Sequence, residues 1–393
     1  MLKGRHIVLG VSGSIAAYKA PDIVSKLVQA GALVDVAMTE GATEFVTPLT
    51  FRSLTHRPVF LDLFHPESEL GVEHVALAQR ADVVVIAPAT ANVLAKIAHG
   101  LADDVVTTTV LATAAPVIVA PAMDGHMFKS AATQENLATL ERRGVTVVGP
   151  AEGYLASGIV GRGRLVDTEE LIGTIRAVLG RAGDFAGRGI VVTAGGTQEP
   201  IDPVRVLTNR SSGKMGYAVA EAARDRGADV TLITGPTALR DPAGVRTLKV
   251  ETARKMGEAV AGALEDASIL VMAAAVADFE PSQAVPSKIK KGNGGLSIDL
   301  VPTLDILDQS RGKGLLVGFA AESENLVANA RAKLEKKGLD LIVANDITAT
   351  DSGFSVDTNR VVILDKDGGE ESLPLLLKSE VAHRILDRVV KLL

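Results

Sequence analysis

The feature that most restricts the fold of this chain is a repeated alternation of short apolar runs with stretches of helical spacing. The apolar runs are rich in β-branched residues and are largely continuous. Strands of that kind are buried on both faces, as in a parallel sheet that helices cover on either side. The alternation occurs in both halves of the chain. The sequence therefore predicts an α/β protein with two tandem units and mainly parallel sheets.

The predicted strands and helices are evenly distributed between the two units. Strands are predicted at 7–10, 34–38, 82–88, 117–120 and 145–149, and again at 190–193, 230–234, 269–275, 315–319 and 341–344. Helical spacing covers 15–29, 134–143, 217–224, 253–265 and 325–337. Residues 354–364, followed by Lys-Asp-Gly-Gly at 366–369, predict a late antiparallel hairpin. Gly, Arg and Asp cluster over 181–188, where we place the join between the units.

Length and composition exclude several classes of protein. A chain of 393 residues is long enough for two cores. The formal net charge of −6 and the lack of a basic stripe argue against nucleic acid as a partner. No apolar run reaches the roughly 18–20 residues that cross a bilayer. The absence of cysteine excludes disulfides and thiolate chemistry. Since residues 1–6 lead directly into a strand without a signal-peptide pattern, we expect a cytoplasmic protein without a membrane partner.

The most specific motif is T-A-G-G-T-Q-E-P-I-D-P-V-R-V-L-T-N-R-S-S-G-K-M-G at 193–216, between a predicted strand and a predicted helix. Its glycines allow the backbone to approach a ligand closely, and N–H groups at a helix start favour anions. Arg205 and Lys214 can neutralise phosphate. The motif predicts a site for a phosphorylated ligand.

Two motifs in the first half end predicted strands with small polar residues. Gly-Val-Ser-Gly-Ser at 10–14 lacks the G-x-G-x-x-G spacing, but it suits a single phosphate monoester as in flavin mononucleotide (FMN). It would equally serve as a tight turn whose Ser caps a helix. Thr90 and Asn92 follow a buried strand, where open α/β sheets place ligands. They can bind a flavin or cap the next helix.

Four further candidates carry both a functional and a structural interpretation. Asp124 ends a buried strand and is a candidate for catalysis or a helix cap, and His74 is either functional or a structural histidine. The loop at 153–164, with four glycines and two arginines, suits folding over an anionic substrate, whereas the alternative is a solvated linker. Asp278 and the lysines at 288–291 suit nucleotidyl transfer, although a lysine run is also typical of a solvated face.

Together these segments resemble the bifunctional phosphopantothenoylcysteine decarboxylase/phosphopantothenate–cysteine ligases of coenzyme A biosynthesis, over essentially the whole chain. The resemblance implies two tandem Rossmann-like domains. Residues 1–183 are similar to the FMN-containing cysteine decarboxylases, and residues 184–393 to the CTP-dependent ligase. The matching pieces are Gly-Val-Ser-Gly-Ser-Ile-Ala at 10–16, Thr-Pro-Leu-Thr-Phe at 47–51, His74, Pro-Ala-Thr-Ala-Asn at 88–92, Pro-Ala-Met at 121–123, the loop at 153–164, the motif at 193–216, Ala-Val-Ala-Asp at 275–278 and Lys-Ile-Lys-Lys at 288–291.

By this resemblance the ligase reaction comes first. CTP, with Mg²⁺, activates the carboxylate of 4′-phosphopantothenate as an acyl-cytidylate, and the amine of L-cysteine then displaces CMP. Asn209 matches the position that handles the acyl-cytidylate, and Lys288 is our choice for stabilising charge on the reacting phosphate. The residues that match the CTP site are Met272, Ala273, Ala274, Asp278, Lys288, Thr303, Leu304, Asp305, Ile306, Phe319, Lys333 and Lys337. The metal ligands stay unknown.

The decarboxylase reaction follows by the same resemblance. FMN oxidises the new cysteine moiety to a thioaldehyde, CO₂ is lost, and reduced flavin returns the hydride to give 4′-phosphopantetheine. The residues that match the FMN site are Gly13, Ser14, Thr39, Thr90, Ala91 and Asn92. His74 matches the catalytic histidine. Asp124 stands where many members have Asn, and Ser157 stands where many carry a cysteine proton donor. Serine is far less acidic than a thiol of pKa about 8.5.

The resemblance also implies a homo-oligomer, with a trimeric decarboxylase and a dimeric ligase that together would build a dodecamer. One rival is a pair of nicotinamide-dependent oxidoreductase domains, but neither 10–13 nor 195–196 has the spaced glycine fingerprint. The other rival is a non-enzymatic flavin-binding scaffold that regulates a partner protein. Such a scaffold would not need His74 or the complete ligase half, and both are present.

Overall fold

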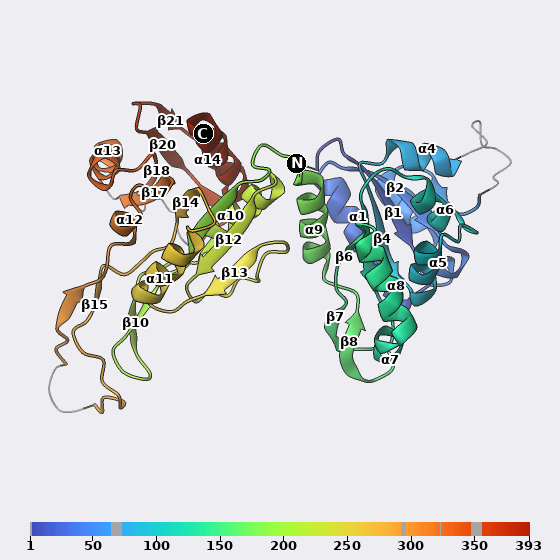
Figure 1. The fold of residues 1–393 in the computed structure, drawn as a ribbon, viewed down its shortest axis with the longest axis horizontal. Coiled ribbons are helices and arrows are strands. Elements are labelled where there is room, and N and C mark those ends of the chain that lie inside the picture. Colours follow the sequence, from blue (N-terminus) through green and yellow to red (C-terminus); the bar gives the residue numbers. More distant parts are fainter. Residues whose placement is uncertain (1, 64–72, 292–295, 323, 347–355) are drawn as a thin grey trace. The chain divides into compact units, whose positions relative to one another are not determined.

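The computed structural model describes residues 2–63, 73–291, 296–322, 324–346 and 356–393. The chain folds into two compact units, residues 1–179 and 180–393 (Figure 1). Each unit has its own sheet, with a hydrophobic cluster on either side of it. The predicted fold class, α/β with mainly parallel sheets, is confirmed.

The first unit is built on a six-stranded parallel sheet in the order β3-β2-β1-β4-β5-β6. Its strands are β1 (His6–Val11), β2 (Leu33–Met38), β3 (Val59–Phe60), β4 (Val83–Ala89), β5 (Val117–Pro121) and β6 (Thr146–Val147). Every residue of β4 is buried, because helices cover both faces of the sheet.

Two groups of helices cover this sheet. On one face lie η1 (Ile15–Lys19), α1 (Ala20–Gln29), α3 (Pro48–Thr55) and α9 (Thr168–Gly180). On the other lie α4 (Glu73–Arg80), α5 (Ala91–His99), α6 (Val105–Ala112) and α8 (Ala131–Arg142) (Figure 1). The short helices α2 (Glu40–Thr43) and α7 (Gly125–Lys129) follow β2 and β5. The helix predicted at 15–29 is split into η1 and α1. Pro21 lies in the first turn of α1, where its missing N–H costs nothing.

The second unit contains an eight-stranded sheet in the order β13-β12-β9-β14-β17-β18-β20-β21. Its first six strands are parallel, and β20 and β21 add antiparallel pairs. The strands are β9 (Gly189–Ala194), β12 (Asp229–Thr234), β13 (Arg246–Lys249), β14 (Ile269–Met272), β17 (Leu315–Glu322), β18 (Leu341–Asp346), β20 (Val361–Asp365) and β21 (Glu370–Ser372). The pair β20–β21 confirms the late hairpin, and its predicted residues 354 and 355 lie outside the described residues.

Helices α10 (Lys214–Asp225) and α14 (Lys378–Leu392) pack on one face of this sheet. On the other face pack α11 (Ala253–Ala263), α12 (Ile306–Gln309) and α13 (Leu326–Lys337). Small antiparallel pairs are formed by β10 (Gln198–Pro200) with β11 (Val206–Thr208), β15 (Phe279–Pro281) with β16 (Leu300–Pro302), and β19 (Thr358–Asn359) with β22 (Leu376–Leu377). Within the part of the chain that the structure describes, no helix has the length and apolar character to cross a membrane.

One segment differs from the sequence expectation. The loop predicted at 153–164 is an antiparallel hairpin of β7 (Ala151–Tyr154) and β8 (Val160–Arg164), because Gly158, with φ of +83°, supplies the reversal. The segment at 181–188, where we place the join, packs with the second unit. Phe185 is fully buried in the second unit, and the Arg226 guanidinium lies 5.1 Å from its ring centroid.

Candidate functional site

The first candidate site lies at the carboxyl edge of the sheet in the first unit. Gly13 and Ser14 follow β1, Thr39 follows β2, and Thr90 to Asn92 follow β4. In the sheet, β1 pairs with β2 on one side and with β4 on the other. The loops after β1 and β4 therefore flank the point where the strand order reverses, which is where open α/β sheets bind ligands. The structure thus brings the six proposed FMN residues to one edge.

Ser12, a residue that the sequence analysis did not single out, holds two of these loops together. Its hydroxyl donates to the carbonyl of Pro88 at 2.7 Å and accepts from the N–H of Thr90 at 3.0 Å, and the side chain is fully buried. The signal was present, since Ser12 is part of the Gly-Val-Ser-Gly-Ser motif. Its role became visible only once β1 and β4 were paired.

The structure also gives the other motif residues local roles. Ser14 accepts from the N–H of Ala16 at 3.2 Å, and Thr90 accepts from the N–H of Val93 at 3.3 Å, so both cap helices. A Cβ on Gly13 would lie 2.8 Å from the carbonyl carbon of Gly41, so no larger residue fits there. These loops present helix starts and hydroxyl groups, which are the chemistry that a phosphate-bearing cofactor requires.

A second group of candidates meets at the β7–β8 hairpin. Ser157 donates its hydroxyl to Oδ2 of Asp124 at 2.6 Å, and Asp124 Oδ1 accepts from the N–H of His126 at 2.8 Å. The hydrogen bond from Ser157 is the main cause that lowers the pKa of Asp124, and the N–H of His126 adds to it. Asp124 is therefore an ionised acceptor at neutral pH.

The base of the hairpin approaches the loop after β5 closely. The N–H of Met123 donates to the carbonyl of Gly163 at 2.9 Å, and a Cβ on Gly163 would lie 2.2 Å from the carbonyl oxygen of Met123. Contact at this distance excludes any side chain at Gly163. The hairpin is thus fixed beside Asp124 by its backbone.

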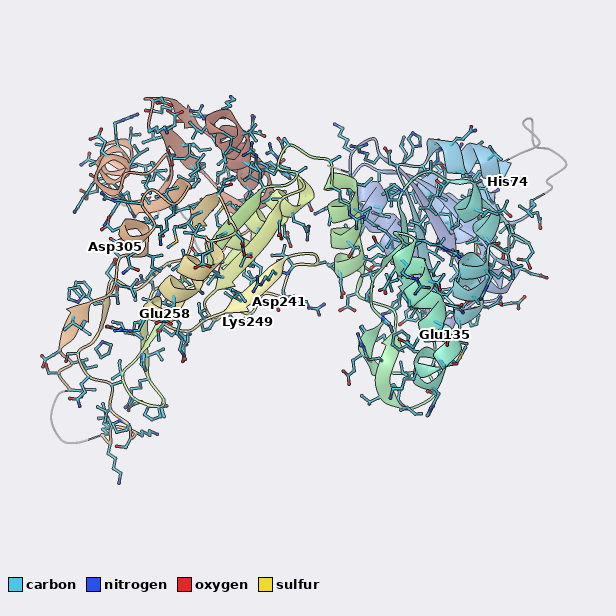
Figure 2. The ribbon with its side chains drawn as sticks, in the orientation of Figure 1. His74, Glu135, Asp241, Lys249, Glu258 and Asp305 are labelled. Atoms are coloured by element: carbon cyan, nitrogen blue, oxygen red, sulfur yellow. The ribbon has the colours of Figure 1, made fainter. Side chains whose placement is uncertain are left out.

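His74 lies in the first turn of α4 (labelled in Figure 2). A crossover helix runs antiparallel to the strands that it connects, so this turn lies at the carboxyl edge of the sheet. Nδ1 of His74 is buried and has no hydrogen-bond partner. Among the described residues, no hydrogen bond joins His74 to Ser14, Thr90 or Asp124. The first turn of α4 lies at the edge where the other candidates lie, but no hydrogen bond in the described part of the unit links His74 to them.

The second candidate site is a cavity of about 710 Å³ in the second unit. It lies beyond the carboxyl ends of β9, β14, β17 and β18 and has the size of a typical ligand pocket. Most residues of the proposed CTP site line it, together with the proposed catalytic amide: Asn209, Met272, Ala273, Ala274, Asp278, Thr303, Leu304, Asp305, Ile306, Phe319, Lys333 and Lys337.

Hydrogen bonds between neighbouring loops shape the floor of this cavity. Thr193 accepts from the N–H of Ala274 at 3.1 Å, and Thr303 donates to the carbonyl of Ala277 at 2.6 Å. Nδ2 of Asn209 donates to the carbonyl of Val276 at 3.0 Å. This bond uses one N–H of Nδ2, so the second N–H and the amide oxygen of Asn209 are the groups that this arrangement leaves for a ligand.

One wall of the cavity carries two lysines from α13. Lys333 donates to the carbonyl of Phe319 at 2.9 Å, and burial lowers its pKa. Lys337 pairs with Asp305, labelled in Figure 2 at the start of α12, and with Asp308 at 3.2 Å. The hydrogen bond that Lys337 donates to Asp305 raises the pKa of Lys337. This wall therefore offers two cations, one of them already balanced by carboxylates.

Lys288 does not line the cavity in the described part of the chain; its side chain is exposed. The next residue is held firmly, because Ile289 donates its N–H to Asp202 at 3.1 Å and its carbonyl accepts from Arg205 at 3.2 Å. Burial raises the pKa of Asp202, but the N–H groups of Val204, Ile289 and Arg205 and the Arg205 guanidinium outweigh it and lower that pKa to about 2. The motif at 193–216 thus anchors the lysine segment through an ionised carboxylate.

The opposite wall contains residues that the CTP assignment did not include. Lys214 begins α10 and Lys378 begins α14, and Asn345 and Asn359 also line the cavity. The sequence analysis did not identify Lys378 as a site residue. In the sequence it is one polar residue of an amphipathic helix, more than 160 residues away from the phosphate motif. Among the described residues, no group of three or more His, Asp and Glu side chains is placed to hold a metal ion.

Two family profiles match this chain. The profile described as "Flavoprotein" matches residues 1–180, and the profile described as "DNA/pantothenate metabolism flavoprotein C-terminal domain" matches residues 185–393. The "Coenzyme A biosynthesis bifunctional protein CoaBC" of Bacillus subtilis is 46% identical over 398 aligned residues, which span 100% of this chain and 98% of the relative. The protein of the same name from Mycobacterium tuberculosis is 46% identical over 408 residues, spanning 99% and 97% of the two chains.

Solved structures are similar to one half of the chain each. A crystal structure of the C-terminal domain of a CoaBC protein is 42% identical, with a TM-score of 0.46, and covers 53% of this chain and 97% of its own. A PPC decarboxylase mutant complexed with pantothenoylaminoethenethiol is 32% identical, with a TM-score of 0.41, and covers 44% and 97%.

Proposed function

This chain belongs to the family of bifunctional coenzyme A biosynthesis proteins, which combine a phosphopantothenoylcysteine decarboxylase with a phosphopantothenate–cysteine ligase, and we propose that its two halves divide these reactions between them. Residues 1–183 are the decarboxylase domain and residues 184–393 the ligase domain. The substrates are 4′-phosphopantothenate, L-cysteine and CTP. The observation that carries this proposal is the cavity of the second unit. Asn209 lines it together with four lysines, which are Lys333 and Lys337 on one wall and Lys214 and Lys378 on the other.

In the ligase, the cavity would hold CTP while the carboxylate of 4′-phosphopantothenate attacks its α-phosphate. Pyrophosphate leaves, and the amine of cysteine then displaces CMP from the acyl-cytidylate. Asn209 would donate the second N–H of Nδ2, the one not bonded to Val276, to the acyl phosphate, and Lys288 would neutralise charge that develops on the phosphate. The anchoring of Ile289 by Asp202 supports this role, because it limits where Lys288 can reach. We propose that Mg²⁺ enters with the triphosphate.

In the decarboxylase, bound FMN would supply the two-electron oxidation that makes CO₂ loss easy and the later reduction. Gly13, Ser14, Thr39, Thr90, Ala91 and Asn92 would hold it at the carboxyl edge. The unpartnered Nδ1 of His74 supports a role for this side chain in binding or proton transfer. Asp124 would orient Ser157, whose hydroxyl would carry a proton to the product.

We propose that the decarboxylase halves assemble as trimers and the ligase halves as dimers, which together would give a dodecamer. Among the residues that the structure describes, His74 has no hydrogen bond to the other candidates of its own unit, which favours a site shared between copies. Several apolar side chains beside the same carboxyl edge are exposed: Ile15, Tyr18, Phe45 and Leu49. A subunit contact would cover them.

One experiment tests the whole assignment. The purified chain is incubated with 4′-phosphopantothenate, L-cysteine, CTP and Mg²⁺, and the products are identified by mass spectrometry. We expect 4′-phosphopantetheine, CO₂, CMP and pyrophosphate, and FMN on denaturation. Asn209→Asp should still bind CTP in a direct titration but form little amide. A chain reconstituted with FMN that yields neither the amide nor 4′-phosphopantetheine would contradict the proposal.

A further inference from the structure

Two asparagines line the cavity of the second unit without belonging to the proposed CTP site. Asn345 is in β18 and Asn359 is in β19, and both line the cavity. Both are nearly enclosed, with 8% of Asn345 and 4% of Asn359 exposed. A pocket usually orients its ligand through a few polar groups of this kind among apolar ones. Neither residue has a role in the assignments made above.

The amides of these two residues have hydrogen-bonding capacity that the protein does not use. Oδ1 of Asn359 accepts from the N–H of Arg360 at 3.1 Å, which leaves the two N–H groups of its Nδ2. Among the residues that the structure describes, no hydrogen bond engages that Nδ2 or either end of the Asn345 amide. A buried amide without a partner is costly, so a molecule in the cavity that bonds to these amides gains affinity.

The position of Asn345 in β18 places its side chain on one face of the sheet. Successive residues of a strand point to opposite faces. Val343 belongs to the hydrophobic cluster beside α10 and α14, whereas Ala344 belongs to the cluster beside α11 and α13. Asn345 follows Val343 by two residues, so its amide lies on the face that α10 and α14 cover. The strand that carries Asn359, β19, contacts α14 as well.

The CTP assignment takes the other side of the cavity, where Leu304 packs with the cluster beside α11 and where Lys333 and Lys337 lie on α13. The carboxylate of 4′-phosphopantothenate has to reach the α-phosphate of CTP, so the rest of this substrate extends to the side that CTP leaves open. Between its carboxylate and its phosphate, the substrate carries an amide and a hydroxyl group. These uncharged groups both donate and accept hydrogen bonds, as carboxamides do, whereas a charged group would favour a lysine or arginine partner.

We propose that Asn345 and Asn359 form a subsite for the pantothenoyl arm of 4′-phosphopantothenate and hydrogen-bond its amide and hydroxyl groups. The inference rests on the ligase function proposed above and extends it to the choice of the acid substrate. On this side of the cavity the enzyme recognises the uncharged arm rather than the charged ends. An acid whose arm lacks these groups loses the hydrogen bonds and binds less tightly.

The test measures amide formation by the full chain through the release of pyrophosphate, with each substrate varied in turn. Asn345→Leu removes both ends of the amide at nearly constant volume. Asn359→Asp keeps the oxygen that accepts from Arg360 and removes the N–H groups of Nδ2. Loss of these hydrogen bonds should raise the KM for 4′-phosphopantothenate about tenfold, while the KM for CTP and the KM for cysteine stay unchanged.

Two substrate analogues identify the arm as the group that is bound. One has an ester in place of the amide, and the other lacks the hydroxyl group next to the amide. The wild-type chain should prefer 4′-phosphopantothenate to at least one of them, and Asn345→Leu or Asn359→Asp should lose that preference. Variants that retain the full preference overturn the subsite, because the asparagines then make no contact with the arm.

A matched variant keeps the test decisive. Asn329→Leu removes an exposed amide of α13 that bonds to Glu322 and lies outside the cavity, and it should leave every KM unchanged. If Asn345→Leu does not fold, Asn359→Asp alone decides the question. A normal KM for 4′-phosphopantothenate in the folded variants, or a raised KM for CTP or cysteine alone, overturns the subsite while the ligase assignment stands. A wild-type chain that releases no pyrophosphate contradicts the ligase assignment itself.

Discussion

Beside β7 and β8, the side chains of Ser157 and Asp124 form a hydrogen-bonded pair. The hydroxyl of Ser157 donates a hydrogen bond to the carboxylate of Asp124, and the lowered pKa of Asp124 keeps this carboxylate ionised at neutral pH. To protonate a product, Ser157 must turn away from Asp124 and be resupplied from water or a neighbouring acid. The pair therefore orients the hydroxyl without making it a stronger acid.

Removal of this hydroxyl should stop the reaction at its last proton transfer. We expect Ser157→Ala to release CO₂ but to give a product two hydrogens short of 4′-phosphopantetheine, because the final reduction needs a proton. Mass spectrometry of anaerobic reactions measures both products, and Ser157→Cys should recover part of the reduction. Ser53→Ala, which removes an exposed hydroxyl bonded to a helix carbonyl, is the control. A normal yield of 4′-phosphopantetheine from Ser157→Ala would exclude Ser157 as the donor.

At the scale of elements, the strands were the easiest part to predict. Runs such as 117–120 and 341–344 are apolar at every position. They form β5 and β18, because a strand that is apolar on both faces is stable where helices cover both faces of the sheet. The β7–β8 hairpin was missed, since its glycines hide the alternation that marks a strand. Lys378 was missed for another reason: its position in the cavity depends on α14 packing beside α10, a contact between distant segments.

The same hairpin allows a sharp comparison of two glycines in β8. A Cβ on Gly163 would meet the carbonyl oxygen of Met123 at 2.2 Å, whereas a Cβ on Gly161 has no atom within 4 Å. Gly163→Ala should therefore push the hairpin away from Asp124, and a displacement of about 1 Å can cost about 100-fold in rate. We expect CO₂ release to fall by about that factor while amide formation is unchanged. Gly161→Ala should retain both rates, and equal CO₂ release by the two variants would refute the hairpin's role.

At the scale of the whole molecule, the two units should fold and work separately. A fragment of residues 180–393 retains Phe185 and Asp184, both of which contact Arg226. We expect it to form the cysteine amide with CTP and to lack decarboxylation. A fragment of residues 189–393 loses the buried Phe185 ring and should be less stable by about 3–5 kcal/mol, the usual cost of deleting a core Phe. Urea unfolding measures the difference, and equal midpoints would show that residues 180–188 are dispensable.

The exposed position of Tyr154 on β7 gives the protein a built-in optical reporter. The chain has no tryptophan and three tyrosines. Tyr154 is 72% exposed on the hairpin and Tyr18 is 63% exposed on η1, whereas Tyr217 is buried inside the second unit. Flavins absorb in the near ultraviolet where tyrosine emits, so an approach of the hairpin to a bound flavin would quench emission from Tyr154 by energy transfer. If the β7–β8 hairpin closes over a substrate, its movement is the part of the change in light emission that disappears in Tyr154→Phe.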